Sequence, residues 1–474
     1  MDSFARLFFG SLLLAILMTG CLDQQAQLEN RVVEGIGASA PGAGVVLGNG
    51  SASKVIVNLA SDFAGESGKK QYMLDVVNEF NVRNPDIFVN ITFEYSTGDD
   101  GFNTSWRRAI AQGFKDDQYP YDIFYANVGN PYNIFNDLLG EKEWGKKYLV
   151  DFSEVPWFIE SHKEFILTDP TYTEPFDGMH VGPYTNGFYI MLWYNKRVAD
   201  RLNLTIREDG MSFQEFLSYV KAVQDYNEMH GTSIAAIQDF NNWKTTEYIY
   251  RHLFKSALGN YNLLLDNKEF DVRRQVALLE TLQAYEELGK YKPLIKGYQD
   301  MSYTEDKGRI LYEEALFTAN GAWMYTHWAG IDEEKVWDMR PAELPVFRAI
   351  DFYSGSYTPV FVVPKGSPRR EEALMFLEFL SSPRLAEKWV RMTKTPTGLK
   401  GNLYDVGLDD DQFSMFYNHL NEKYSKFHYD DSSASILGAK HADFDDELDD
   451  LAQKVLAGEL TAQQAYDDIM DYID

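Results

Sequence analysis

Few residues in this chain form a pattern that is typical of catalysis. The chain has 474 residues, and its 8 histidines include no His-Glu-x-x-His or His-x-x-x-His pair of the kind that binds zinc. No Gly-x-Ser-x-Gly nucleophile elbow occurs, and the only cysteine, Cys21, excludes an intrachain disulfide and a multi-cysteine metal site. The 72 acidic residues allow too many combinations to test for a pair of glycosidase carboxylates. We therefore predict no catalytic residue, no cofactor and no metal ion, and we keep a surface glycoside hydrolase as the alternative of a different class.

Aromatic residues are interleaved with polar ones in two segments that we expect to be loops, residues 239–243 (DFNNW) and 325–328 (YTHW). Exposed ring faces stack on the apolar faces of sugar rings, while neighbouring carboxylates and amides bind the hydroxyl groups. This combination favours an uncharged, polyhydroxylated ligand. Core packing remains the alternative for any single tryptophan.

Composition and charge exclude two further classes of protein. The 9 Trp, 30 Tyr and 31 Phe residues supply far more apolar surface than a disordered chain carries. The net charge of −28, with no cluster of Lys and Arg, argues against binding nucleic acid. Thirteen acidic residues against two lysines give the last 45 residues a net charge of −11, which we interpret as the solvated face of helices. Calcium is the alternative there, although no Asp-x-Asp-x-Asp-Gly spacing is present.

The N-terminus is typical of an exported protein. Residues 7–17 form an apolar run that matches the core of a signal peptide and is too short to span a bilayer. Residues 17–21 (LMTGC) resemble a bacterial lipobox, in which Cys21 becomes lipidated and N-terminal. We expect residues 1–21 to be a lipoprotein signal, residues 22–53 a flexible spacer, and the mature protein to be anchored to the outer face of the cell membrane. A signal peptide with an incidental cysteine is the alternative.

The rest of the chain alternates between strand and helix patterns. Short β-rich runs at 55–59, 88–95, 121–124 and 188–194 are separated by segments with helical periodicity, which predicts an α/β fold with helices on both faces of a sheet. Ser212 and Glu215 form a capping box that opens a helix. Later helices are predicted at 243–258, 271–288, 371–380 and 383–392, and the last third is mostly helical.

Five segments after the spacer carry a family pattern in a fixed order: residues 194–198 (YNKRV), 211–216 (MSFQEF), 317–324 (FTANGAWM), 364–389, and 456–465 (LAGELTAQQA). They resemble motifs of the extracellular solute-binding proteins of ABC transporters, the family that includes maltose-binding protein. Thr318, Ala319, Asn320 and Trp323 depart from the strand motif of that family. The resemblance implies a type II periplasmic-binding-protein fold, with mixed sheets flanked by helices in two lobes around a cleft. We expect lobe one at 54–190 plus 340–392, and lobe two at 191–339 plus 393–474.

The resemblance also implies which residues line the cleft, because the family's binding residues follow particular strands. In this sequence those positions hold eight residues: Asp62, Phe63, Asn127, Asn130, Tyr184, Asn186, His327 and Trp328. Trp328 is the main expectation, as a platform on which a sugar ring stacks. Trp243 and Tyr357 are added because of their positions in loops.

The function implied is capture without reaction. A monomeric lipoprotein would bind an oligosaccharide between its lobes and deliver it to a membrane permease, because the ligand contacts both lobes only in the closed form. Aromatic cages also suit polyamines, so a polyamine or another small solute is an alternative ligand. An adhesive surface protein without a cleft is a further alternative.

Overall fold

The computed structural model describes residues 54–95, 101–127, 129–266, 269–401, 412–424, 426–428, 434–441 and 444–473. The predicted signal peptide, the lipobox with Cys21 and the spacer therefore lie outside the described residues. Within the described ranges, no helix is both long enough and apolar enough to cross a bilayer.

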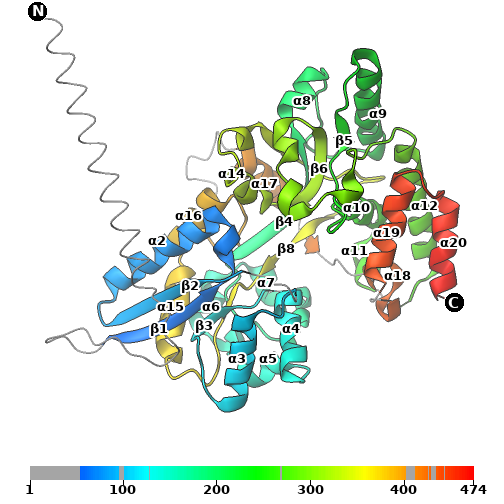
Figure 1. Ribbon diagram of the computed structural model, residues 1–474. Helices are drawn as coiled ribbons and strands as arrows, with labels where there is room; N and C mark the ends of the chain where they lie inside the picture. The colour runs from blue at the N-terminus through cyan, green and yellow to red at the C-terminus, as the bar shows by residue number, and fades with distance from the viewer. Residues whose placement is uncertain are drawn as a thin grey trace, which may run out of the picture. The chain divides into compact units, whose positions relative to one another are not determined.

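The first sheet has the strand order β2-β1-β3-β9 and belongs to the lobe that begins at residue 54 (Figure 1). Strand β1 pairs in parallel with β2 and β3, whereas β9 is antiparallel to β3. The bounds are β1 Val55–Ser61, β2 Ile87–Phe93, β3 Ile123–Tyr125 and β9 Phe361–Val362. The α/β alternation predicted for this part of the chain is confirmed.

Helices pack around this first sheet. Helix α2 (Ser67–Arg83) buries Tyr72, Met73, Val76 and Phe80, and it packs against α16 and β2. The other helices of this lobe are α3 Ser105–Asp116, α4 Asn130–Leu139, α5 Trp144–Tyr148, α6 Pro156–Ser161, α7 Glu164–Thr168, α15 Arg370–Leu380 and α16 Pro383–Thr393. The helices predicted at 371–380 and 383–392 are thus present.

The second sheet has the order β10-β8-β4-β6-β5, and β7 pairs with β4 beside it. Its strands are β4 Asn186–Asn195, β5 Ala235–Ile237, β6 Ala315–Gly321, β7 Met339–Ala342, β8 Phe352–Thr358 and β10 Lys426–His428. Because β7 and β8 belong to this sheet, the chain returns to the first sheet after Thr358 and not at residue 340. The expected lobe boundary is corrected accordingly.

The helices of the second lobe also pack through their apolar faces. Those before the return are α8 Lys196–Arg201, α9 Phe213–His230, α10 Glu247–Leu258, α11 Tyr261–Leu265, α12 Val272–Gly289, α13 Tyr303–Asp306 and α14 Met324–Ala329. Those after it are α17 Gln412–Lys423, α18 Ala434–Leu437, α19 Asp445–Leu456 and α20 Ala462–Ile473. Helices α19 and α20 pack on α12, and α19 buries Leu448, Val455 and Leu456 beneath its acidic face.

The capping box predicted at the start of α9 is confirmed. The Ser212 hydroxyl accepts a hydrogen bond from the Glu215 backbone N–H at 3.2 Å, and the Glu215 carboxylate accepts one from the Ser212 N–H at 2.9 Å. These bonds lower the pKa of Glu215 to about 2, with a further contribution from Arg207. Two N–H groups that the helix itself leaves unpaired are thereby satisfied.

We expect Ser212→Ala to lower the free energy of unfolding by about 1 kcal/mol at pH 7, because the N-cap acceptor is lost. The folded pKa of Glu215 lies below its unfolded value of about 4.3, so its contribution is present above that pH and is lost as the pH falls towards 2. The cost of the substitution should therefore shrink on acidification. Urea unfolding at several pH values measures it. Ser218→Ala, in the same helix, is the control and should cost almost nothing; equal costs would contradict the assignment.

Candidate ligand-binding site

Four aromatic rings from four parts of the second lobe meet in one cluster, which we call the aromatic cluster: Phe188, Trp243, Tyr303 and Trp323. The Trp243 ring centre lies 4.4 Å from that of Tyr303 and 6.2 Å from that of Trp323, and the two indoles are nearly parallel, 20° apart. Phe188 meets Trp323 edge-on at 5.4 Å. Trp243, Tyr303 and Trp323 are each only partly buried, so the cluster is not fully enclosed by the protein.

The loop between β5 and α10 carries Trp243 and is held from both ends. Asp239 is fully buried, and its carboxylate accepts hydrogen bonds from Thr246 and Gln453 at 2.6 and 2.7 Å. The Asn242 side chain accepts one from the Tyr303 backbone N–H at 2.8 Å. Burial raises the pKa of Asp239, and these hydrogen bonds oppose that rise. The polar residues of this loop thus position the ring beside Tyr303.

The position of the Trp323 ring depends on Gly321, two residues earlier in the chain. Gly321 pairs with Ile190, so both lie on the face of the sheet that also presents Phe188. A Cβ at position 321 would come within 2.1 Å of the Trp323 ring. The indole therefore lies directly over the backbone of Gly321, where no side chain fits.

Two buried oxygens on the same face of the sheet lack hydrogen-bond partners. Asn186 and Thr358 are paired across β4 and β8, two residues along from Phe188 on the same face. They are 6% and 1% exposed, and within the described part of the chain neither Asn186 Oδ1 nor Thr358 Oγ1 has a partner. A buried polar atom without a partner costs about 1–3 kcal/mol. A water molecule or a polar ligand would remove that cost.

The charges at the start of α2 form neutral pairs. Arg107 lies 2.5 Å from Asp62, and both are buried. Burial lowers the pKa of Arg107, and the neighbouring Asp62 opposes this. Lys69 pairs with Glu66 at 2.7 Å. These four groups therefore contribute no net charge.

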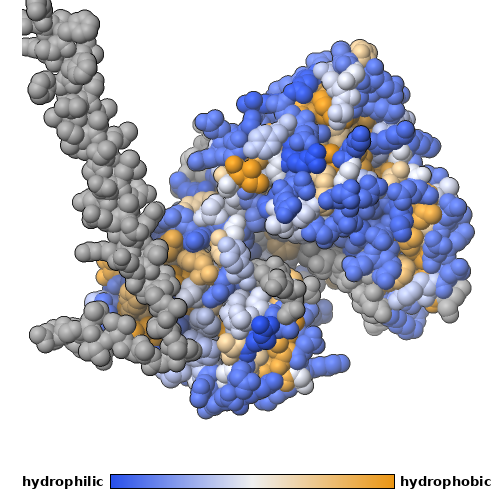
Figure 2. All heavy atoms as spheres, in the orientation of Figure 1, coloured by the Kyte–Doolittle hydropathy of each residue, from blue (hydrophilic) through white to orange (hydrophobic). Residues whose placement is uncertain are grey.

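His327 on α14 lies close enough to Glu66 and Lys69, at the start of α2, for their charges to affect its pKa. Burial lowers its pKa, the charges of Lys307 and Lys69 lower it further, and Glu66 opposes them, so the imidazole is neutral at neutral pH. Helices α2 and α14 touch here, because a Cβ on Gly68 would lie 3.1 Å from Thr326 Cγ2. The surface between the two lobes is hollowed in Figure 2.

Trp328 is not the exposed platform that we expected. It is fully buried, its ring meets that of Trp193 edge-on at 5.2 Å, and its Nε1 donates to the Lys307 carbonyl at 2.7 Å. A ring enclosed on all sides has no face for a sugar, so Trp328 is corrected to a core residue. Trp323, five residues earlier, has the partly exposed indole.

Tyr184, Tyr357 and Phe63 are likewise core residues, which corrects their assignment. Tyr184 donates to the Tyr172 carbonyl at 2.6 Å and is fully buried. The Tyr357 hydroxyl lies 2.5 Å from that of Tyr189, on the face of the sheet opposite to Phe188. Phe63 is 1% exposed and packs against other rings.

Of the remaining residues that we expected to bind ligand, some lie at the aromatic cluster or on its face of the sheet, and others are bonded to neighbouring residues. The structure brings Trp243 into the aromatic cluster, and it places Asn186 on the same face of the sheet as Phe188. Asn127 donates to the Tyr125 hydroxyl at 3.0 Å, and Asp62 is engaged by Arg107. Asn130 is the first residue of α4, and its side chain lies outside the described residues.

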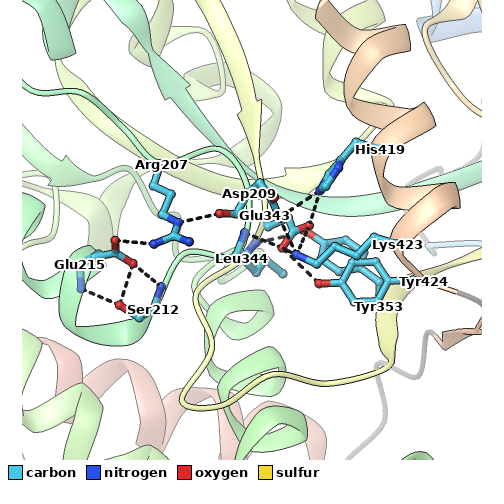
Figure 3. A network of polar contacts seen from close by, with 11 residues as sticks. Arg207, Asp209, Ser212, Glu215, Glu343, Leu344, Tyr353, His419, Lys423 and Tyr424 are labelled. Atoms are coloured by element: carbon cyan, nitrogen blue, oxygen red, sulfur yellow. Dashed lines mark hydrogen bonds and ion pairs between the residues drawn. The ribbon is translucent and has the colours of Figure 1, made fainter.

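Among the described residues, a separate polar network contains three side chains whose atoms are close enough together to hold a metal ion. Oxygen and nitrogen atoms of Asp209, Glu343 and His419 lie within 4.8 Å of one another. Lys423 Nζ, however, lies 2.6 Å from Asp209 and 2.7 Å from Glu343 (Figure 3). Burial alone would lower the pKa of Lys423, but its hydrogen bonds with the two carboxylates outweigh burial and raise it. The ammonium therefore takes the place of a cation.

Residues 64–387 match the family model described as bacterial extracellular solute-binding protein. The chain belongs to this family. Its members bind solutes outside the cytoplasm, so an extracytoplasmic location follows. No curated protein sequence matches the chain.

Solved structures with the same fold include sugar-binding proteins. RafE from Streptococcus pneumoniae has a TM-score of 0.64 and 14% identity, covering 89% of this chain and 97% of its own. The GacH receptor of Streptomyces glaucescens GLA.O, crystallised unliganded and with acarbose, has a TM-score of 0.62, 13% identity, and coverages of 89% and 97%. A chitin oligosaccharide binding protein has a TM-score of 0.62, 13% identity, and coverages of 88% and 98%. At such identities the likeness shows the two-lobed fold.

Sequence reasoning about this solute-binding protein missed three members of the aromatic cluster: Phe188, Tyr303 and Trp323. Phe188 is buried within β4, as expected, and its ring also lies at the edge of the aromatic cluster. The sequence does contain one signal for the position of Trp323: a glycine, Gly321, at the end of a strand and two residues before the tryptophan leaves room for its ring.

We expect Gly321→Ala to displace the Trp323 indole, because the added Cβ would overlap it. Affinity for the bound solute should fall about tenfold, and the tryptophan fluorescence spectrum should shift. Calorimetry and fluorescence measure the two effects. Gly401→Ala is the control, since its Cβ would meet its neighbours at ordinary distances of 3.4–3.7 Å. Unchanged affinity and spectrum in Gly321→Ala would contradict the placement of the indole.

Proposed function

We propose that the protein captures an oligosaccharide at the aromatic cluster and releases it chemically unchanged. The observation that carries the proposal is the pair of nearly parallel, partly exposed indoles of Trp243 and Trp323. Their faces provide apolar, polarisable surface for the C–H faces of sugar rings. The unpartnered oxygens of Asn186 and Thr358 lie on the same face of the sheet as Phe188 and would accept hydrogen bonds from sugar hydroxyl groups.

The comparisons support a sugar over other solutes. Structures with the same fold include RafE in complex with raffinose and a Bacillus licheniformis sugar transporter protein in complex with stachyose. Polyamines are disfavoured by a specific observation: the ammonium of Lys307 lies 5.4 Å from the ring centre of Tyr303, within the aromatic cluster. A cationic ligand would meet a like charge there.

Capture and transfer would follow from the two-lobed architecture. A solute that contacts both lobes stabilises the closed arrangement, which a membrane permease then recognises. The proposed lipid on Cys21 would keep the protein at the outer face of the membrane, with residues 22–53 as a tether. The protein would act as a monomer.

A reaction is not part of the proposal. The carboxylates of Asp62 and Glu66, at the start of α2, are both held in ion pairs. A glycosidase needs one carboxylic acid and one free carboxylate on opposite sides of the bond that it cleaves. Asp62 and Glu66 therefore neutralise the charges of Arg107 and Lys69 and are not free for acid–base catalysis.

Calorimetry with a panel of oligosaccharides and small solutes tests the proposal. We expect binding of at least one oligosaccharide with a dissociation constant near micromolar, which corresponds to about −8 kcal/mol. Chromatography of the recovered ligand should show it intact, with no new reducing ends. Silence from every saccharide would overturn the proposal, and cleavage of the ligand would favour the hydrolase.

We expect Trp323→Ala to weaken oligosaccharide binding by about tenfold to thirtyfold, because the stacking surface is lost. The melting temperature should fall as well, because the ring packs against Phe188 and Trp243, so binding is measured well below it. Trp337→Ala is the control: this tryptophan is 46% exposed, lies in the same lobe and does not belong to the aromatic cluster. If both variants bind as the unaltered protein does, the aromatic cluster is not the binding site.

A further inference from the structure

We propose that the oligosaccharide taken at the aromatic cluster carries a carboxylate, as a hexuronate residue does, and that the Lys307 ammonium binds it. This inference rests on the proposed function and names the class of its ligand. It also changes the expectation from the aromatic and polar residues interleaved at 239–243 and 325–328, which favoured an uncharged ligand.

Lys307 is placed at the aromatic cluster by its position in the chain. It follows Tyr303 by four residues, one helical turn, and its backbone N–H donates to the Tyr303 carbonyl at 3.2 Å. Its Nζ lies 5.4 Å from the centre of the Tyr303 ring, which itself contacts Trp243 at 4.4 Å. A group bound by this ammonium would therefore belong to a sugar that stacks on the neighbouring indoles.

The ammonium is not neutralised by the protein. Among the described residues, no carboxylate lies within 4.0 Å of Lys307, and its Nζ donates only to the Thr304 carbonyl, at 2.8 Å. Asp62 and Glu66 are already paired with Arg107 and Lys69. Lys307 thus has no ion-pair partner among the described residues, and its ammonium is available to a ligand at the aromatic cluster.

The backbone of Lys307 is fixed from two sides. Its carbonyl accepts hydrogen bonds from Trp328 Nε1 at 2.7 Å and from Gln238 Nε2 at 3.4 Å. Trp328 is fully buried, so the structure assigns it a positioning role behind the ammonium instead of a stacking role in front of it. An anchored backbone reduces the conformational entropy that binding would cost.

The chemistry of the ammonium selects the ligand class. Lys307 is partly buried, and this burial lowers the pKa of its ammonium. A single carboxylate restores the neutrality of the region and forms charge-assisted hydrogen bonds, which are stronger than those to a neutral hydroxyl. A neutral sugar would leave the ammonium poorly solvated, so it would bind less tightly.

Matched acid and ester ligands test the inference. The probes are oligogalacturonides and glucuronic acid-bearing xylo-oligosaccharides, each compared with its own methyl ester, by calorimetry on the full chain. We expect the acid form of the binding ligand to bind at least about tenfold more tightly than its ester. Esters or neutral oligosaccharides that bind as well as the acids would overturn this inference and leave the proposed function intact. Silence from every saccharide would overturn both.

A pair of lysine variants assigns the effect to one residue. Lys307→Met should weaken the acid about tenfold and bind the ester at least as tightly as the unaltered protein does, because no charge is then left poorly solvated; retained ester binding also shows that the variant is folded. Lys335→Met is the matched control, because Lys335 Nζ lies at the same 5.4 Å from the ring of Tyr312, outside the aromatic cluster. An unchanged ratio of acid to ester affinity in Lys307→Met would overturn the role of Lys307.

Discussion

The structure depends on the pairing and alternation of strand β4. Its first residues pair with β8, which leads to the first lobe, and its last residues pair with β6 and β7 of the second. All ten of its residues are buried. Because side chains alternate between faces, a shift of one residue would move Phe188 to the wrong side and exchange it for Tyr189. The aromatic cluster exists only in this register.

The two faces of β4 treat their polar groups differently. On the Tyr189 face, the hydroxyls of Tyr189 and Tyr357 lie 2.5 Å apart, and both donate to Asn421 on α17. On the Phe188 face, Asn186 Oδ1 and Thr358 Oγ1 have no partner within the described chain. The hydroxyl groups on the Tyr189 face are therefore satisfied by hydrogen bonds within the protein. The Phe188 face would gain stability from a polar molecule that is bound there.

The fold could be predicted further from the sequence than the site could. The strand at 188–194 and the capping box at Ser212 are local patterns, and both are present. Trp323 and Trp328 could not be told apart, because each is a tryptophan near a predicted strand end. Trp323 is the N-cap of α14 and Trp328 lies within this helix; five residues correspond to about 140° around a helix, so the two rings point in different directions, one into the core and one partly exposed. Only the packing of α14 decides which.

The net charge of −28 and the charge at the aromatic cluster concern different properties. Exposed charges more than about 8 Å from a bound solute are largely screened at physiological salt, so the net charge of the whole chain acts on solubility more than on recognition. Asp62 and Glu66 are held in ion pairs, whereas the Lys307 ammonium at the aromatic cluster has no ion-pair partner among the described residues. An acidic protein is therefore able to select an acidic ligand, because the local balance of charge, and not the total, determines what binds.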